Sequence, residues 1–213
     1  TPDAVLRPAF EALQPLAPFD SGLDLCCGTG AALRLLRPLC GTRAVGLDLS
    51  RGMLDVGRLR QNGAPDPTAL DWVRADALAL PFAPDSFDLV VSFGAFGHFV
   101  EADQERLLAE VSRVLAPGGR FAFVTAEMPP PWSARYWLGR GFNAAMRVRN
   151  RLVQPPFIMY YLTFVLSDVR RALVRLGLEV DAAPLPGALG RRGLRLVIAA
   201  APPRPAPAPA RSP

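Results

Sequence analysis

Hydrophobic residues between positions 22 and 125 form short apolar runs, and the segments between these runs carry apolar residues at helical spacing. The runs are "GLDL" (22–25), "RAVGLDL" (43–49), the segment around Trp72 and Val73, "FDLVVSF" (87–93) and "RFAFVT" (120–125). Short runs of this kind are typical of buried strands. Because strands that alternate with amphipathic helices build parallel sheets covered on both faces, the pattern predicts an α/β fold.

Two helices have clear apolar faces. The first precedes a Pro-Gly-Gly stop at 117–119, and its apolar stripe consists of Leu107, Leu108, Val111, Val114 and Leu115. The second lies in "SDVRRALVRLGLEV" (167–180), where we predict Ser167 as the N-cap and Gly177 as the end. A strand follows this helix, and "LRLVIAAA" (194–201) is predicted as the last strand.

The formal net charge of +5 comes entirely from arginine, because the sequence contains no lysine, and the arginines are scattered over most of the chain. A solvated basic surface is the expected explanation. An acidic substrate, an anionic membrane or a nucleic acid are the alternatives.

The three cysteines, Cys26, Cys27 and Cys40, are predicted to fill the core of a protein in a reducing cytoplasm, because adjacent cysteines do not build a disulfide framework. We expect no metal, because their spacing is not that of a zinc site and the only histidine, His98, lies far along the chain. No apolar run reaches the roughly 20 residues of a spanning helix, which predicts a soluble protein without a transmembrane segment. The chain begins at Thr1 rather than Met, so a trimmed leader or a lost N-terminal helix stays open.

The stretch "LDLCCGTG" (23–30) runs from a predicted strand into a glycine turn, where a ligand can approach the backbone closely. A dinucleotide fingerprint would require a third glycine, but Leu33 stands at that position in the frame that starts at Gly28. Asp48 ends the second predicted strand, where its carboxylate has two roles open to it. It can accept both hydroxyls of a ribose, or it can cap the helix that follows.

The ordered set of "LDLCCGTG", "VGLDLS", "ADALALPF", "FDLVVS" and "VLAPGGRF" resembles the class I S-adenosylmethionine-dependent methyltransferases, in particular the small-molecule group called type 11. The resemblance covers residues 21–125 well and 167–200 more loosely. It implies a Rossmann-like, doubly wound, seven-stranded sheet that is mostly parallel with an antiparallel last strand. It also implies S-adenosylmethionine as the cofactor, with S-adenosylhomocysteine as its product and no metal.

The resemblance also implies roles for single residues. Asp24, Gly28 and Gly30 would line the loop beside the methionine part of the cofactor, with the backbone of Cys26. The other cofactor-binding positions implied are Asp48 at the ribose, Met53 near the adenine, Asp76 with the backbone of Ala77 at the adenine edge, and Ser92 facing the transferable methyl. The family usually has Gly or Ala at the position of Cys26, so we expect Cys26 to adopt a backbone angle that does not need glycine.

On this basis we predict one methyltransferase domain over 1–200. It consists of an N-terminal helical segment (1–20), a cofactor-binding half (21–125), a lid or substrate insertion (126–166) and a C-terminal helix with strands (167–200). The insertion is rich in Pro, Arg and aromatic residues, and the Pro/Ala-rich tail 201–213 is predicted to be disordered.

The acceptor predicted is a small molecule, because the sequence lacks the motifs typical of DNA amino-group and RNA cytosine methyltransferases. Trp132, Trp137, Tyr160 and Tyr161 of the insertion, with Phe157, are candidate walls of the acceptor pocket. His98 is the candidate general base, with pocket lining or loop orientation as the alternatives. Two other functions stay open: a tRNA or protein methyltransferase that uses the basic insertion, and a cofactor-binding module without catalysis.

Overall fold

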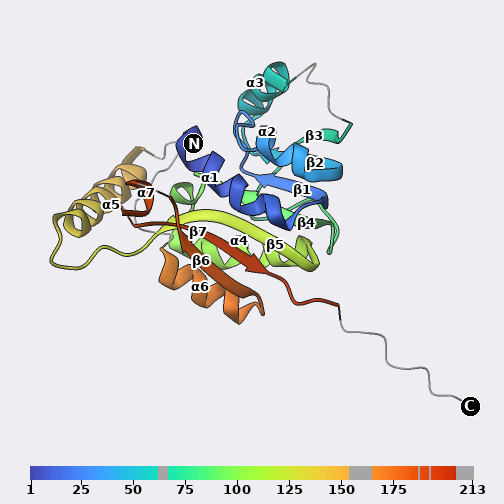
Figure 1. Ribbon diagram of the computed structural model, residues 1–213. Coiled ribbons are helices and arrows are strands. Elements are labelled where there is room, and N and C mark those ends of the chain that lie inside the picture. The colour runs from blue at the N-terminus through green and yellow to red at the C-terminus, as the bar shows by residue number, and fades with distance from the viewer. Residues whose placement is uncertain (62–66, 154–164, 187, 192, 205–213) are drawn as a thin grey trace, which may run out of the picture.

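A seven-stranded sheet with helices on both faces forms the body of the protein (Figure 1). The computed structural model describes residues 1–61, 67–153, 165–186, 188–191 and 193–204. The strands are β1 (Phe19–Leu25), β2 (Cys40–Asp48), β3 (Ala69–Arg74), β4 (Phe87–Ser92), β5 (Leu115–Ala126), β6 (Glu179–Pro184) and β7 (Leu194–Ala200). Their order is β3-β2-β1-β4-β5-β7-β6, and β7 is antiparallel to both of its neighbours. The predicted doubly wound sheet with an antiparallel last strand is confirmed.

Seven α-helices and three short 3-10 helices are seen in the described ranges. They are α1 (Asp3–Leu13), α2 (Leu33–Leu36), α3 (Arg51–Gln61), α4 (Glu101–Val114), α5 (Ala134–Val153), α6 (Leu166–Arg175), α7 (Ala188–Arg191), η1 (Gln14–Leu16), η2 (Arg37–Leu39) and η3 (Phe96–His98). No helix in this part of the chain is both long and apolar enough to cross a membrane.

The hydrophobic core consists of two clusters, one on each face of the sheet. α4 and α6 cover one face, with residues such as Val111 and Leu173 packed on Val90 and Phe121. α1 and α2 cover the other face. Because both faces of β1, β2, β4 and β5 are buried, their sequences are apolar runs rather than alternating patterns.

Two predicted helix boundaries are wrong. α6 begins at Leu166, so Ser167 lies inside the first turn, where its hydroxyl donates to the Asp168 carboxylate at 3.2 Å instead of capping the helix. α4 ends at Val114, before the Pro-Gly-Gly stop, because the backbone of Leu115 already pairs with Phe87 of β4. The predicted end of α6 is confirmed, since Gly177 follows it with a φ of +83°.

The helix after the glycine turn is short, and the insertion is more regular than its sequence suggests. α2, which follows the turn, has only four residues and continues into η2, which contains Pro38 and therefore lacks one backbone N–H. The insertion contains a regular helix of 20 residues, α5, which projects from the body beyond the end of β5 (Figure 1).

Candidate cofactor and acceptor site

The predicted cofactor residues follow strands that end at one edge of the sheet. β1, β2 and β4 are mutually parallel, and they end at Leu25, Asp48 and Ser92. The loop after β1 therefore lies beside the ends of its two neighbours. In open α/β sheets this edge is where ligands bind.

Asp48 holds the glycine loop to the end of β2. Its Oδ2 accepts the backbone N–H of Gly28 at 2.8 Å, and its Oδ1 accepts the backbone N–H of Ser50 at 2.8 Å. The backbone N–H of Cys27 donates to the Leu47 carbonyl at 2.9 Å, which ties the same loop to β2 a second time. Because the Gly28 amide already donates to a carboxylate, it is not available to a phosphate.

The two loop glycines have different reasons to be glycine. Both have positive φ values, +53° at Gly28 and +79° at Gly30. A Cβ on Gly30 would clash with the Trp72 ring and the Gln61 side chain, whereas a Cβ on Gly28 would meet nothing within 4 Å. Gly30 therefore serves packing, and Gly28 faces open space that a ligand can enter.

Asp24 is a buried carboxylate directly before this loop. Its side chain is 1% exposed, and its Oδ2 has no hydrogen-bond partner among the described residues. Burial raises the pKa of Asp24 to about 8, and a hydrogen bond from the Leu33 backbone offsets part of this effect. An unpartnered buried oxygen of this kind suits a ligand that brings its own N–H donors, such as an ammonium group.

Cys26 is the first residue of the loop after β1. Burial raises the pKa of its thiol to about 12, and the negative charges of Asp48, Asp24 and Asp76 act in the same direction. The carboxylates of Asp48 and Asp76 favour a cationic ligand at this point, and such a ligand would in turn favour the ionised form of Asp24. The expectation for the backbone of Cys26 is wrong, since its φ of +58° lies in the left-handed region that favours glycine.

The remaining predicted cofactor positions follow or end the strands β2, β3 and β4. Asp76 and Ala77 follow β3, where Asp76 Oδ1 accepts the Leu78 N–H at 2.9 Å and Ala77 is buried. Met53, in the first turn of α3, is 49% exposed. Ser92 is 1% exposed, and its hydroxyl donates to the Leu25 carbonyl at 2.9 Å, so this hydroxyl joins the ends of β1 and β4.

Three side chains of α4 fix the segment after Asp76, and sequence reasoning missed them. Glu110 accepts the Leu80 N–H at 2.7 Å, and Arg113 donates to the Leu80 and Phe82 carbonyls. Arg106 donates to the Leu78 carbonyl at 2.8 Å. The side-chain hydrogen bond from Arg113 lowers the pKa of Glu110. The spacing of 106, 110 and 113 on one helix face was the available signal, although it does not reveal what that face contacts.

His98 ends η3, six residues beyond the end of β4, and is partly buried. Its backbone N–H donates to the Ala95 carbonyl at 2.9 Å. The chain thus carries His98 past the edge of the sheet at which the cofactor candidates lie. Its catalytic role stays a prediction.

The predicted acceptor residues are not gathered in the described part of the chain. Trp132 and Trp137 are 86% and 64% exposed, so neither side chain lies in an enclosed pocket. Tyr160, Tyr161 and Phe157 lie outside the described residues.

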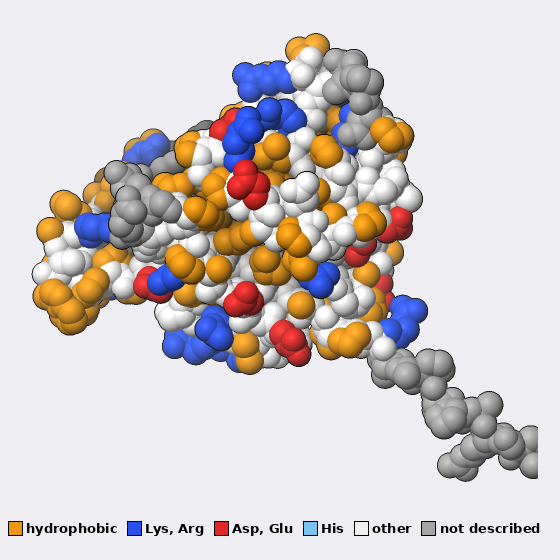
Figure 2. Space-filling model, viewed as in Figure 1, with side chains coloured by type: hydrophobic (Ala, Val, Ile, Leu, Met, Phe, Trp, Pro, Cys, Tyr) orange, Lys and Arg blue, Asp and Glu red, His pale blue; other side chains and the backbone are white. Residues whose placement is uncertain are grey.

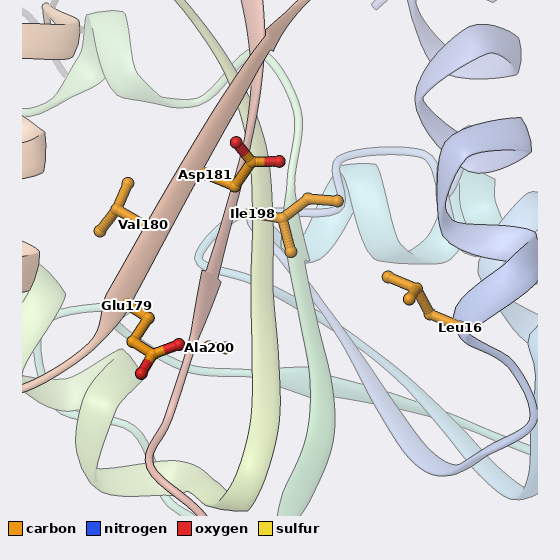
Figure 3. A pocket seen from close by; sticks show the side chains of 6 residues that line it. All are labelled: Leu16, Glu179, Val180, Asp181, Ile198 and Ala200. Atoms are coloured by element: carbon orange, nitrogen blue, oxygen red, sulfur yellow. The ribbon is translucent and has the colours of Figure 1, made fainter.

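A separate hollow of about 340 Å³ lies at the opposite end of the sheet, between β6, β7 and Leu16 (Figure 3). Figure 3 shows Asp181 and Ile198 turned toward this hollow and Val180 turned away from it. Ala200, which also lines it, pairs with Arg120 in the middle of β5, six residues before the carboxyl end of that strand. In the described ranges, no group of three or more His, Cys, Asp or Glu side chains is arranged to hold a metal ion.

The strand order and the loop tied to an acidic strand end define the cofactor-binding fold of class I methyltransferases. Residues 23–123 match a family model described as a methyltransferase domain. A demethylmenaquinone methyltransferase of Thermus thermophilus is 37% identical over 168 residues, which cover 78% of this chain and 69% of that protein. The chain belongs to the class I S-adenosylmethionine-dependent methyltransferases of type 11.

Other similarities are partial or concern the fold. A 2-phytyl-1,4-naphtoquinone methyltransferase of Thermosynechococcus vestitus is 39% identical over 111 residues, which cover 51% of this chain and 47% of that protein. This chain thus spans about half the length of several curated relatives that it matches. A crystal structure of an S-adenosylmethionine-dependent methyltransferase from Mesorhizobium loti is 27% identical, with a TM-score of 0.64 over 91% of this chain and 96% of that chain. NodS of Bradyrhizobium japonicum, in complex with S-adenosyl-L-homocysteine, shares the fold at 17% identity, with a TM-score of 0.66 over 93% of this chain and 86% of that chain.

Proposed function

We propose that this chain transfers the methyl group of S-adenosylmethionine to a small-molecule acceptor with a quinone-type ring. The observation that carries the cofactor assignment is the placement of three carboxylates beside the loop after β1: Asp24 directly precedes the loop, Asp48 accepts a backbone N–H from it, and Asp76 follows β3, the neighbour of β2. A negative site suits a sulfonium cofactor with an α-ammonium group. It suits a dinucleotide poorly, because the pyrophosphate would meet carboxylates and the Gly28 amide is already bonded to Asp48.

The residues present fit the cofactor. Asp24 would hold its ammonium group with the unpartnered Oδ2, and Asp48 would accept the ribose hydroxyls. Asp76, the Ala77 backbone and Met53 would contact the adenine, and the space over Gly28 would admit the methionine part. When bound, the cofactor supplies an electrophilic methyl group on a positively charged sulfur.

The transfer requires little acid–base chemistry from the protein. The acceptor atom forms a bond to the methyl carbon, the carbon–sulfur bond breaks, its electron pair neutralises the sulfur, and the acceptor loses a proton. The chain's contribution is alignment and exclusion of water at the edge of the sheet. The buried Ser92 keeps the ends of β1 and β4 in register through the Leu25 carbonyl, and His98 is the candidate acceptor of the proton.

The acceptor class rests on the relatives. The two curated relatives reported above are named as methyltransferases of a naphthoquinone and of demethylmenaquinone, and the Thermus thermophilus relative matches along most of this chain. A tRNA or protein acceptor lacks this support. The atom methylated is proposed to be a ring carbon, as in the relative named a ubiquinone/menaquinone C-methyltransferase from Paracoccus denitrificans.

The first test is cofactor binding. Calorimetry with S-adenosylhomocysteine is expected to show binding by the wild-type chain and a loss of tenfold or more in Asp48→Asn, the scale of about 1.5–3 kcal/mol for hydrogen bonds to a charged group. Asp168→Asn is the matched control, because it removes a carboxylate on α6 whose partners among the described residues are Arg171 and the Ser167 hydroxyl. Equal affinities in all three proteins would remove Asp48 from the site.

The second test is the reaction itself. Isotope-labelled S-adenosylmethionine is incubated with the chain and either a short-chain demethylated naphthoquinol, bulk tRNA or a protein extract. Label in the quinol, with a mass gain of one methyl group, is the expected result. Label in tRNA or protein alone would overturn the small-molecule acceptor, and binding of the cofactor without any transfer would favour the non-catalytic module.

A further inference from the structure

Helix α5 is attached to the body along a narrow strip. Of its 20 residues only Asn143 is buried. The helix follows the carboxyl end of β5, and β5 is parallel to β4, so α5 lies beyond the same edge of the sheet as the candidate cofactor site. Figure 1 shows it projecting from the body at this edge.

The outer face of α5 is apolar. Trp137, Leu138, Val148 and Leu152 are 64%, 72%, 60% and 78% exposed. At about 100° of rotation per residue, the four side chains fall within an arc of about 100° on the helix surface. Figure 2 shows hydrophobic side chains gathered at the end of the molecule from which α5 projects. An outward apolar face is the reverse of the pattern in an ordinary surface helix.

Arginines flank this apolar face on both sides. Arg140 and Arg151 lie on one side of the arc, and Arg149 lies on the other. Arg140 contacts the Tyr136 ring at 5.5 Å, and Arg149 contacts the Met146 sulfur at 3.9 Å. None of these three arginines forms an ion pair with an acidic side chain in the described part of the chain.

The segment that contains α5 carries a strong excess of positive charge. Residues 128–167 hold five of the 24 arginines and none of the 19 acidic residues. The rest of the chain therefore has 19 arginines and 19 acidic residues, so its formal charge is zero. Residues 182–213 likewise hold five arginines and no acidic residue, so the α5 segment is one of two strongly basic stretches of the chain.

We propose that α5 docks the protein on the surface of an anionic lipid bilayer. An apolar stripe that carries a tryptophan and is bordered by arginines is the composition of helices that lie in the bilayer interface, with the stripe at the acyl boundary and the cations at the headgroup phosphates. A second copy of α5 would bring two arginine-flanked faces of like charge together. RNA would leave the apolar stripe without a partner, since phosphates bind only the flanks. The proposal rests on the surface of α5 and requires no particular methyl acceptor.

Co-sedimentation of the full chain with lipid vesicles tests the proposal. The vesicles are phosphatidylcholine alone, or phosphatidylcholine with about one third phosphatidylglycerol, at low and at high salt. We expect binding to the anionic vesicles that weakens with salt. Arg149→Gln/Arg151→Gln should lower the partition coefficient about 25-fold, at about fivefold for each arginine near the surface. Leu138→Ser/Leu152→Ser should lower it at least tenfold, because two leucines leave the bilayer.

Matched controls lie elsewhere on the surface. Leu59→Ser removes a leucine of equal exposure, 76%, from α3. Arg171→Gln/Arg175→Gln removes the same charge from α6, where both arginines pair with carboxylates. These controls should change the partition coefficient less than threefold. Unchanged melting temperatures and S-adenosylhomocysteine affinities show that the α5 variants are folded.

Every other outcome overturns the proposal. Absence from both vesicle pellets, equal binding to neutral vesicles, or equal losses in the α5 and control variants would each do so. An α5-dependent change in oligomeric state without vesicle binding would assign the face to a second copy, and α5-dependent RNA binding without vesicle binding would assign it to nucleic acid. Because the vesicles contain no acceptor, failure here leaves methyl transfer untouched, and failure of methyl transfer leaves vesicle binding untouched.

Discussion

Replacing Cys26 by glycine should not destabilise the protein, whereas the same change at Cys27 should. Cys26 has a φ of +58°, a conformation that costs an L-residue about 1–2 kcal/mol. Cys27 has no such angle, is 8% exposed, and places its sulfur 3.0 Å from the position that a Cβ on Gly46 would take. Two neighbouring cysteines thus differ in backbone conformation and in packing.

The magnitudes follow from these two environments. Cys26→Gly releases the strain of about 1–2 kcal/mol and loses about 0.5–1 kcal/mol to the greater freedom of glycine in the unfolded chain. With the loss of a partly buried thiol, the free energy of unfolding should stay the same or rise by up to about 1 kcal/mol. Cys27→Gly has no strain to release and leaves a gap in the core, so it should lose about 2–3 kcal/mol.

Urea unfolding and thermal melting of both variants, with Cys26→Ala as a third, provide the assay. Alanine keeps the positive φ and removes the thiol, so it should fall below Cys26→Gly by about 1 kcal/mol. Cys26→Gly and Cys27→Gly should differ by roughly 9 °C in melting temperature, at about 2–4 °C per kcal/mol. The reasoning fails if Cys26→Gly is as unstable as Cys27→Gly, or if Cys26→Ala is the more stable of the Cys26 variants.

Three further predictions concern the same edge of the sheet. Because the pKa of Asp24 is raised from 3.8 to about 8, the ligand-free protein should lose stability as the pH rises between these values, and Asp24→Asn should flatten this loss in urea unfolding; an unchanged slope contradicts it. Binding of S-adenosylhomocysteine at pH 7 should release a proton, seen in calorimetry as heats that differ between buffers, and Asp24→Asn should abolish the difference. Gly30→Ala should cost about 2 kcal/mol or more, while Gly141→Ala in α5, where a Cβ meets open space, should gain about 0.5–1 kcal/mol; equal effects would refute the packing role of Gly30.

The sheet and the cofactor half could be predicted because their signals are local. Apolar runs mark buried strands, and the resemblance of the ordered motifs to class I methyltransferases implied the doubly wound arrangement. Asp48 could be placed at a strand end because it directly follows "AVGL". Its distance from Gly28 could not be predicted, because that contact joins residues 20 positions apart.

Helix α5 was not predicted, although its apolar residues recur at helical spacing. Helical periodicity of apolar residues indicates a face that packs on a core, whereas the apolar face of α5 points outward. Gly139 and Gly141 further weaken the helical pattern. The hydrogen bonds of Arg106, Glu110 and Arg113 could not be predicted for a different reason. Their partners are backbone groups of residues 78–82, which leave no signal in the sequence.

Asp48 shows why two alternatives from the sequence need not exclude each other. As a helix cap it would accept backbone N–H groups, and as a ribose ligand it would accept hydroxyls. The structure assigns one oxygen to the Ser50 N–H and the other to the Gly28 N–H. An ionised carboxylate offers about four acceptor positions, so these two bonds leave one on each oxygen for a diol. The residue that would bind the ribose therefore also fixes the loop beside it, and its loss should reduce loop order as well as affinity. For this reason Asp48→Asn, which keeps one acceptor oxygen, reports on the site more cleanly than Asp48→Ala.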